Sequence, residues 1–316
     1  MLKKGIIKRL TISSLALLIL LITYFFPTKM ANNYPQTLSY SDIKTNAVYV
    51  LDKNSYVSRI NMKVNNEETI EKIKEIIDIL TLKSQGSAYL PTDFYGVIPV
   101  GTKINDLSLQ DGLLKLDFSK EFLNTTKDME RKMLEAIVYS LTEMPEVTSI
   151  ILFVDGSQLL ELPFSKEKLP PVLDKDFGVN KTYDIDSIKN TTKTTIYYGS
   201  KNGDYFYYIP ITYVDNNAQE KIEVIIEKLK TSPLYESHLI SYLHANAEVT
   251  NYEILEQEIK LSFNTYLLDD LTSNNVLEEV KYTIFLSLRD TYNIDKVEFN
   301  VESDTENVNF IINSLE

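Results

Sequence analysis

The stretch from Val97 to Gly156 constrains the fold of this chain more than any other part of it. Its centre alternates apolar and polar residues, with Leu114, Leu116 and Phe118 on one side of the pattern. A period of two predicts a strand that lays one face on a core. The preceding pair Asp111-Gly112 suits the positive φ angles of a tight turn. We therefore expect a β-hairpin with one buried face.

A change of period follows the hairpin. Between residues 128 and 143 apolar side chains recur every three or four positions, which predicts an amphipathic helix that Pro145 ends. Residues 147–154 are strongly β-prone and predict a strand, and Asp155-Gly156 predicts the turn after it.

A β-prone region and a helix precede the hairpin. Residues 47–51 and 55–64 favour strands, and residues 67–83 have one apolar face, with Asn66 as the expected helix cap. The unit therefore has the predicted order strand, helix, strand, strand, helix, strand (β-α-β-β-α-β), with helices packed on a sheet. This is an α+β fold.

The same order recurs in the C-terminal half. Phe118 corresponds to Phe263 at an offset of 145 residues, and Ile73 corresponds to Ile222 at an offset of 149. Such agreement predicts a tandem repeat of domains. Glu256-Gln257 stands where the first unit has its Asp-Gly pair, so the second hairpin needs a different turn.

These patterns divide the chain into five predicted parts. They are a basic cytoplasmic tip and transmembrane signal anchor (1–30), a stalk (31–44), a first domain (45–165), a linker rich in Pro and polar residues (166–193) and a second, divergent domain (194–316).

The N-terminal segment predicts attachment to a membrane. Residues 10–28 carry no charge and are just long enough to cross hydrocarbon as a helix of about 20 residues. Four basic residues precede them, which predicts a cytoplasmic N-terminus and an extracytoplasmic body in a single-pass protein of the cell membrane. Residues 24–31 offer a poor cleavage site, so we expect a retained anchor, with a cleaved signal peptide as the alternative.

Charge and cysteine content exclude several classes of function. The formal net charge is −13, and because residues 1–30 hold five cations and no acid, the remainder carries −18. Phosphate backbones would repel such a body, so we expect no nucleic-acid partner. The absence of Cys excludes disulfides, thiolate zinc sites and a cysteine nucleophile.

Few residues qualify as catalytic or ligand-binding candidates. His238 and His244 are the only histidines, and their spacing of six does not fit a helical metal-binding pair. Asp111, Asp117 and Asp155 could form a hydrolytic carboxylate pair, but two of them precede Gly in predicted turns and the third lies on the outward face of a strand. We expect no catalytic residue, no metal and no cofactor.

Several separate pieces of the first unit together resemble a known family. They are Ile98-Pro99-x-Gly101-Thr102-x-Ile104, Asp111-Gly112, Leu116-Asp117-Phe118-Ser119, Thr142-Glu143-x-Pro145-x-Val147 and Val154-Asp155-Gly156. In order and spacing they are similar to the Germane (GerMN) domain of the GerM family of sporulation and spore germination proteins. The second unit matches the pattern only in outline.

The resemblance implies a function as well as a fold. It implies a membrane-tethered, extracytoplasmic protein with tandem α+β domains similar to the ring-building motifs of envelope assemblies. Its implied role is a non-enzymatic scaffold in sporulation or germination. The family's best-known members are lipoproteins, and because this chain has no Cys it would hold the membrane by residues 10–28.

Two hypotheses for the binding partner follow. The first is a scaffold whose outer faces and edge strands bind other envelope proteins, such as a sporulation complex, with homo-oligomer formation as a further expectation. The alternative is a protein that binds peptidoglycan or another cell-wall ligand through Tyr205 and Tyr207 in a Tyr-rich strand. Alternating tyrosines are also ordinary strand formers with one face in a core, which is the competing explanation.

Overall fold

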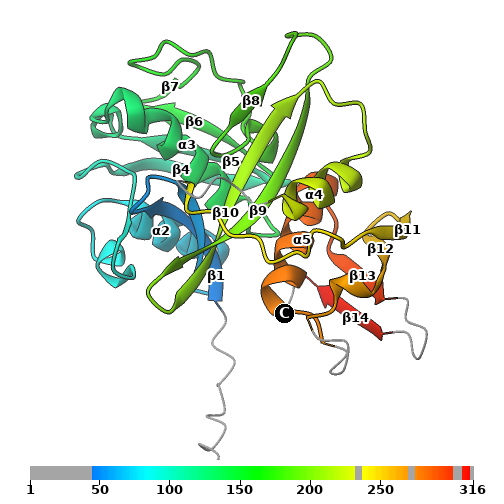
Figure 1. Ribbon diagram of the computed structural model, residues 1–316. Coiled ribbons are helices and arrows are strands. Elements are labelled where there is room, and N and C mark those ends of the chain that lie inside the picture. The colour runs from blue at the N-terminus through cyan, green and yellow to red at the C-terminus, as the bar shows by residue number, and fades with distance from the viewer. Residues whose placement is uncertain (1–44, 232–236, 270–274, 302–307, 314–316) are drawn as a thin grey trace, which may run out of the picture. The chain divides into compact units, whose positions relative to one another are not determined.

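Two repeats of the same elements account for most of the structure. A computed structural model describes residues 45–231, 237–269, 275–301 and 308–313 (Figure 1). The elements of the first repeat are β1 (Thr45–Asp52), β2 (Val57–Lys63), α2 (Thr69–Leu80), the 3-10 helix η1 (Gly86–Tyr89), β3 (Phe94–Tyr95), β4 (Ile104–Gln110), β5 (Leu113–Phe118), η2 (Lys120–Leu123), α3 (Lys127–Leu141), β6 (Ser149–Val154) and β7 (Ser157–Gln158). Those that follow are η3 (Lys175–Phe177), β8 (Thr182–Asp184), β9 (Thr192–Asn202), β10 (Tyr205–Asp215), α4 (Lys221–Lys230), β11 (Val249–Ile254), β12 (Glu258–Phe263), η5 (Thr265–Leu267), α5 (Glu278–Tyr292), β13 (Lys296–Val301) and β14 (Val308–Asn313).

The α+β class is as expected, but each repeat opens differently from the predicted order. The β-prone region that opens each repeat forms a two-stranded hairpin, β1–β2 in the first repeat and β9–β10 in the second. A further strand ends each repeat, so the order common to both is β-β-α-β-β-α-β-β, with the short β3 added in the first. The expected cap of α2 was also wrong. Glu68, not Asn66, caps the helix by accepting a hydrogen bond from the Glu71 amide at 2.8 Å, whereas Asn66 donates to Glu75 further along the helix.

The strands form three sheets. A four-stranded sheet in each repeat has the order β4-β5-β6-β7 or β11-β12-β13-β14. In both, the pair flanking the long helix is parallel, β5 with β6 and β12 with β13, because α3 or α5 forms the crossover between its strands. The two sheets therefore share one topology.

The third sheet contains strands of both repeats. Its order is β3-β1-β2-β10-β8, with β9 paired to β10, so the opening hairpins of the two repeats lie in one sheet. They meet where Arg59 of β2 pairs with Tyr208 of β10 in antiparallel fashion. Residues 45–316 accordingly form one compact unit, and Figure 1 shows the β9–β10 hairpin running between the helices of the two repeats.

The predicted core face of the central hairpin is confirmed. Leu114, Leu116 and Phe118 of β5 are all fully buried, and the Phe118 ring stacks on Phe122 with centroids 4.5 Å apart. The second repeat buries Ile259, Leu261 and Phe263 of β12 in the same way. The expected linker also packs against the body. Its Phe177 and Val179 are buried, and β8 pairs in parallel with β10.

The expected membrane segment and stalk lie outside the described residues. Among the residues that the structure describes, no helix is long and apolar enough to cross a membrane. The division of the chain into domains at residues 165 and 194 stays a prediction.

Candidate functional site

The turn residues of the first repeat serve the fold. Asp111 and Gly112 have φ angles of 50° and 80°, the two positive values that a tight two-residue hairpin turn requires. Gly112 has a second reason to lack a side chain, because an added Cβ would lie 2.6 Å from Oγ1 of Thr148. The backbone geometry of the turn thus accounts for Asp111.

The other two candidate carboxylates are also engaged in turns. Asp117 accepts hydrogen bonds from the Gly156 amide at 3.1 and 3.2 Å, and Asp155 accepts one from the Asn105 side chain at 3.3 Å. Asp155 and Gly156 both have positive φ angles, as expected for the turn that joins β6 to β7. Asp111 and Asp155 thus lie in the predicted turns, whereas Asp117, predicted on the outward face of its strand, is half-buried and bonded to one of these turns.

The two histidines do not assemble a ligand set. His244 accepts a hydrogen bond from the Asn246 amide at its Nδ1 and stacks on Tyr266 with ring centroids 5.0 Å apart. The backbone carbonyl of His238 accepts from Ser200. Within the described ranges, no group of three or more His, Cys, Asp or Glu side chains could hold a metal ion.

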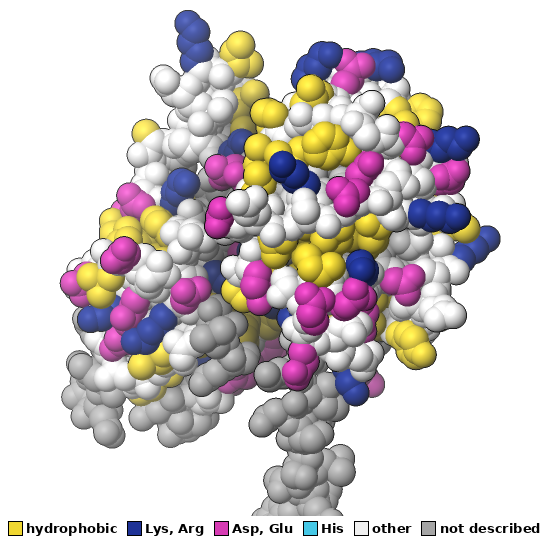
Figure 2. Space-filling view, turned by 180° about the vertical axis from the view of Figure 1, so that it is seen from behind, with side chains coloured by type: hydrophobic (Ala, Val, Ile, Leu, Met, Phe, Trp, Pro, Cys, Tyr) yellow, Lys and Arg dark blue, Asp and Glu magenta, His cyan; other side chains and the backbone are white. Residues whose placement is uncertain are grey.

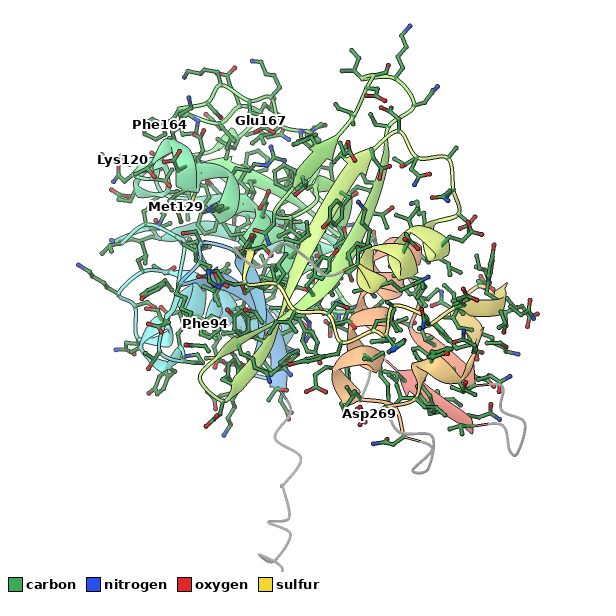
Figure 3. The ribbon with its side chains drawn as sticks, viewed as in Figure 1. Phe94, Lys120, Met129, Phe164, Glu167 and Asp269 are labelled. Atoms are coloured by element: carbon green, nitrogen blue, oxygen red, sulfur yellow. The ribbon has the colours of Figure 1, made fainter. Side chains whose placement is uncertain are left out.

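The two tyrosines of the expected wall-ligand face stack with ring centroids 6.3 Å apart but differ in burial. Tyr207 is 2% exposed, and its hydroxyl donates to Oδ2 of Asp52 at 2.9 Å. Phe94, labelled in Figure 3, packs edge-on against Tyr207 with centroids 4.9 Å apart and also contacts Tyr205. Tyr205 is 38% exposed. A ligand could therefore stack on Tyr205, whereas the ring of Tyr207 is covered.

Equivalent side chains of the two repeats converge at their junction. The amide of Tyr49 donates to Oγ of Ser140 at 2.8 Å, and the amide of Tyr197 donates to Oγ of Ser287 at 2.9 Å. The tyrosines are 148 residues apart in sequence, yet their hydroxyl oxygens lie 2.7 Å from each other. The repeats are therefore related by an approximate two-fold axis that passes between β2 and β10, as in an isologous dimer.

Two equivalent carboxylates flank this tyrosine pair. The Tyr49 hydroxyl donates to Oε1 of Glu143 at 2.8 Å, and the Tyr197 hydroxyl donates to Oδ2 of Asp290. The two acids lie near the C-terminal ends of corresponding helices. Glu143 follows the end of α3, and Asp290 is in the last turn of α5. Asp290 is almost fully buried, with a side chain only 1% exposed.

Two cations neutralise the carboxylates. Nη2 of Arg289 lies 2.5 Å from Glu143 and 3.0 Å from Asp290, while Nζ of Lys175 lies 3.3 Å from Glu143 and 2.7 Å from Asp290. We call these six residues, Tyr49 and Tyr197 included, the inter-repeat lock. Its charges sum to zero, and each is within contact distance of an opposite charge.

The electrostatics of the inter-repeat lock stabilise its charged form. Burial alone would raise the pKa of Glu143, but Arg289 and Lys175 outweigh it and hold that pKa well below its ordinary value. The pKa of Asp290 is lowered by the same two cations against the effect of burial. Burial and the nearby carboxylates raise the pKa of Tyr49 and Tyr197. The cluster thus holds two carboxylates, each in contact with both cations, beside two neutral hydroxyls that meet at the junction of the repeats.

The four-stranded sheets of the two repeats each have an exposed edge strand, β4 in the first and β11 in the second. Among the strands that the structure describes, β11 is paired with β12 alone, and five of its six residues are exposed. β4 occupies the corresponding edge of the first repeat. On the face of the molecule in Figure 2, acidic and basic side chains are interspersed and form no continuous basic stripe.

Comparisons with known proteins agree with this architecture. A family model described as "Germane: Sporulation and spore germination" matches residues 47–160. The spore germination protein GerM of Bacillus subtilis (strain 168) is 27% identical over 267 residues, which is 83% of this chain and 72% of that protein. The structure of the tandem GerMN domains of the B. subtilis sporulation protein GerM superposes with a TM-score of 0.75 at 24% identity, covering 84% of this chain and 97% of that one.

The class is an α+β protein whose first repeat matches the Germane model and whose fold matches that of tandem GerMN domains. Within that class, the chain is similar in sequence and in fold to the sporulation and spore germination protein GerM, the likeness that its sequence motifs predicted.

The inter-repeat lock was the functional feature that sequence inspection missed. Its signal was present, because Tyr49 and Tyr197 recur at an offset of 148 residues and Glu143 and Asp290 at an offset of 147. Nothing in the sequence alone indicates that two equivalent residues should touch each other. Glu143 also belongs to one of the pieces that carry the family resemblance, which fits a role at the junction of the repeats.

Proposed function

We propose that this chain is a non-enzymatic scaffold of the cell envelope that acts in sporulation or spore germination. The likeness to GerM supports the biological process. The inter-repeat lock is the observation that carries the scaffold role, because it fixes two equivalent sheets in one compact body. A body of this kind can present two edges to partners at a constant separation.

The partner surfaces in this proposal are the edge strands β4 and β11. An unpaired edge offers a row of backbone donors and acceptors to an incoming strand. Glu253 of β11 pairs inward with Lys260 of β12 at 3.7 Å, across the sheet face. This ion pair does not cover the backbone groups on the outer edge of β11. The partners would be other envelope proteins, or a second copy of this chain.

The proposal also includes membrane attachment through residues 10–28 with residues 45–316 outside the cytoplasm. The uncharged length of the segment and the basic residues ahead of it support this arrangement. Protease added to intact protoplasts should degrade the body of the full chain and leave a cytoplasmic control protein whole. Protection of the body in intact protoplasts would contradict the proposed location.

Site-specific photocross-linking in the producing cells tests the scaffold role. A photoreactive residue at Ser108 of β4 or at Thr250 of β11 should give discrete protein adducts during sporulation or germination. The matched control is the same residue at Lys74, which is exposed on the outer side of helix α2. The proposal fails if the edge positions give no adducts beyond those of Lys74, and the mass of any adduct separates a foreign partner from a second copy.

The alternative function is binding of a cell-wall ligand to Tyr205 and Tyr207, but one of these two rings is buried. Tyr207 is covered by Phe94 and hydrogen-bonded to Asp52. The hypothesis stays a prediction for Tyr205, with no second exposed aromatic partner from the same expected pair.

A further inference from the structure

A polar hollow lies on the outer face of the second repeat's four-stranded sheet. Its volume is about 300 Å³, and it crosses β11, β12, β13 and β14. The residues that line it are Asn251, Tyr252, Glu253, Lys260, Leu261, Ser262, Glu298, Asn300 and Asn309. Neither the family likeness nor the proposed scaffold role assigns a function to this face.

Strand register builds the floor of the hollow as one row of uncharged side chains. Asn251 of β11 pairs with Ser262 of β12, Ser262 pairs with Asn300 of β13, and Asn300 pairs with Asn309 of β14. Residues in register on adjacent strands project from the same face of a sheet. Each of these four side chains can both donate and accept hydrogen bonds. Four such groups in a line offer alternating donors and acceptors to a ligand lying across the strands.

Asn300 at the centre of the row has an unused acceptor. Its Nδ2 donates to Oγ of Ser262 at 3.4 Å, while its Oδ1 is buried and has no hydrogen-bond partner among the described residues. Leaving a buried polar atom unpaired costs about 1–3 kcal/mol. A ligand that donates a hydrogen bond in the hollow would supply the missing partner.

The corresponding face of the first repeat has no such row. By the same register, the positions equivalent to Asn251, Ser262, Asn300 and Asn309 hold Asp106, Asp117, Phe153 and Gln158. Phe153 places an aromatic ring where the second repeat has the central amide. The Asp117 carboxylate is already occupied by the Gly156 amide. The row of uncharged side chains is therefore present in the second repeat and absent at the equivalent positions of the first.

We propose that this hollow binds a neutral saccharide. The floor is uncharged and so favours a neutral ligand, while the rim carries Lys260 between the carboxylates of Glu253 and Glu298, which disfavours anions. The net charge of −18 beyond residue 30 opposes binding of anions. Hydroxyl and acetamido groups both donate and accept, which matches the row of Asn and Ser side chains. Tyr252 pairs with the buried Leu261 and so projects from the opposite face of the sheet, which leaves the row of amides and hydroxyls as the surface that recognises the ligand.

The size of the hollow agrees with this ligand class. Small-molecule sites commonly have volumes of about 300–1,000 Å³, so this one suits a ligand of one or two sugar rings. The inference does not depend on the proposed scaffold role, because it concerns the outer face of one sheet and not an edge strand. Either proposal can fail without the other.

The test is binding of defined oligosaccharides to the full chain in a detergent that has no sugar headgroup. Saturation-transfer NMR with tetrasaccharides of N-acetylglucosamine, glucose and mannose covers acetamido and plain hydroxyl ligands. At least one should bind, with protons of one or two rings in contact. If none of the three binds at about 10 mM, each dissociation constant is larger than about 10 mM, and the proposal is overturned.

Two substitutions locate the site. Asn300→Phe copies the residue of the first repeat, fills the hollow and should weaken binding at least about tenfold. Asn251→Ala removes one end of the row and should weaken binding about threefold to tenfold, as expected for one hydrogen bond. The matched control is Asp106→Ala at the equivalent position of the first repeat, which should leave affinity unchanged. An unchanged thermal midpoint shows that each variant is folded.

Other outcomes overturn the assignment. If Asn300→Phe is folded and binds the saccharide as tightly as the parent chain, the hollow is not the site. If a basic peptide binds and the saccharides do not, the carboxylates of Glu253 and Glu298 determine the ligand and the proposed class is wrong.

Discussion

Replacement of Arg289 by Met should destabilise the chain by an amount typical of a broken buried ion pair. The guanidinium contacts Glu143 at 2.5 Å and Asp290 at 3.0 Å, and its own side chain is 13% exposed. Met keeps much of the side-chain volume but leaves two buried carboxylates with one remaining cation, Lys175. Removing one partner from such a pair costs about 3–5 kcal/mol, because the remaining charge stays buried without compensation.

Urea denaturation of the full chain, followed by circular dichroism, measures this loss. With a slope of about 1–3 kcal/mol per molar urea, and toward the upper value for a chain of this size, the midpoint should fall by roughly 1–2 M. The effect should persist at about 1 M salt, because buried pairs are screened far less than exposed ones.

The matched control for this experiment is Lys74→Met. Lys74 and Glu71 form an ion pair of similar length, 2.6 Å, but about half of each side chain is exposed. An exposed pair contributes about 0–1 kcal/mol and is weakened by salt. If Arg289→Met costs no more free energy of unfolding than Lys74→Met, the inter-repeat lock does not hold the repeats together and the reasoning is refuted.

Three further predictions concern pH and backbone geometry. The lowered pKa of Glu143 stabilises the fold above its ordinary pKa and loses that contribution as pH falls below about 4.5, so acid unfolding of Glu143→Gln should depend less on pH over that window than that of the parent chain. Burial, with Arg131 nearby, lowers the pKa of Lys181 to about 8, so stability should rise between about pH 8 and 10.5, where the unfolded chain binds more protons, and Lys181→Met should flatten that rise in urea titrations. Gly112→Ala should destabilise by about 1–3 kcal/mol more than Gly203→Ala in the same assay, because both sites have positive φ but only the Cβ at residue 112 would collide with a neighbour, Thr148; equal losses would contradict the role of the close contact at Gly112.

Local interactions explain what the sequence could predict. The Asp111-Gly112 turn and the buried Leu116 and Phe118 depend on residues close in sequence, and both expectations match the structure. Helix α3 begins and ends within two residues of the predicted 128–143. The prediction of the α2 cap failed because Asn66, of a residue type preferred at N-caps, is bound to Glu75 instead, and Glu68 accepts the hydrogen bond from the helix.

Contacts between the repeats could not be predicted in the same way. Pairing of Arg59 with Tyr208 joins strands from different halves of the chain, and no local pattern fixes it. Tyr207 illustrates the consequence. Alternation placed it on the same strand face as Tyr205, but Asp52 and Phe94 of the other repeat bury it. The expected ligand face therefore depended on a tertiary contact that single-sequence reasoning does not contain.

The divergence of the second repeat has a physical explanation at the two-fold axis. Equivalent acids, Glu143 and Asp290, meet there, and two carboxylates at short range repel each other unless cations intervene. The position of Arg289 corresponds in the first repeat to Thr142, which only bonds back to its own helix. A first repeat paired with a copy of itself would thus bring two Glu143 carboxylates together without this guanidinium. Since the second repeat supplies the arginine, the junction favours unlike repeats over like ones, and the tandem arrangement places the required partner in the same chain.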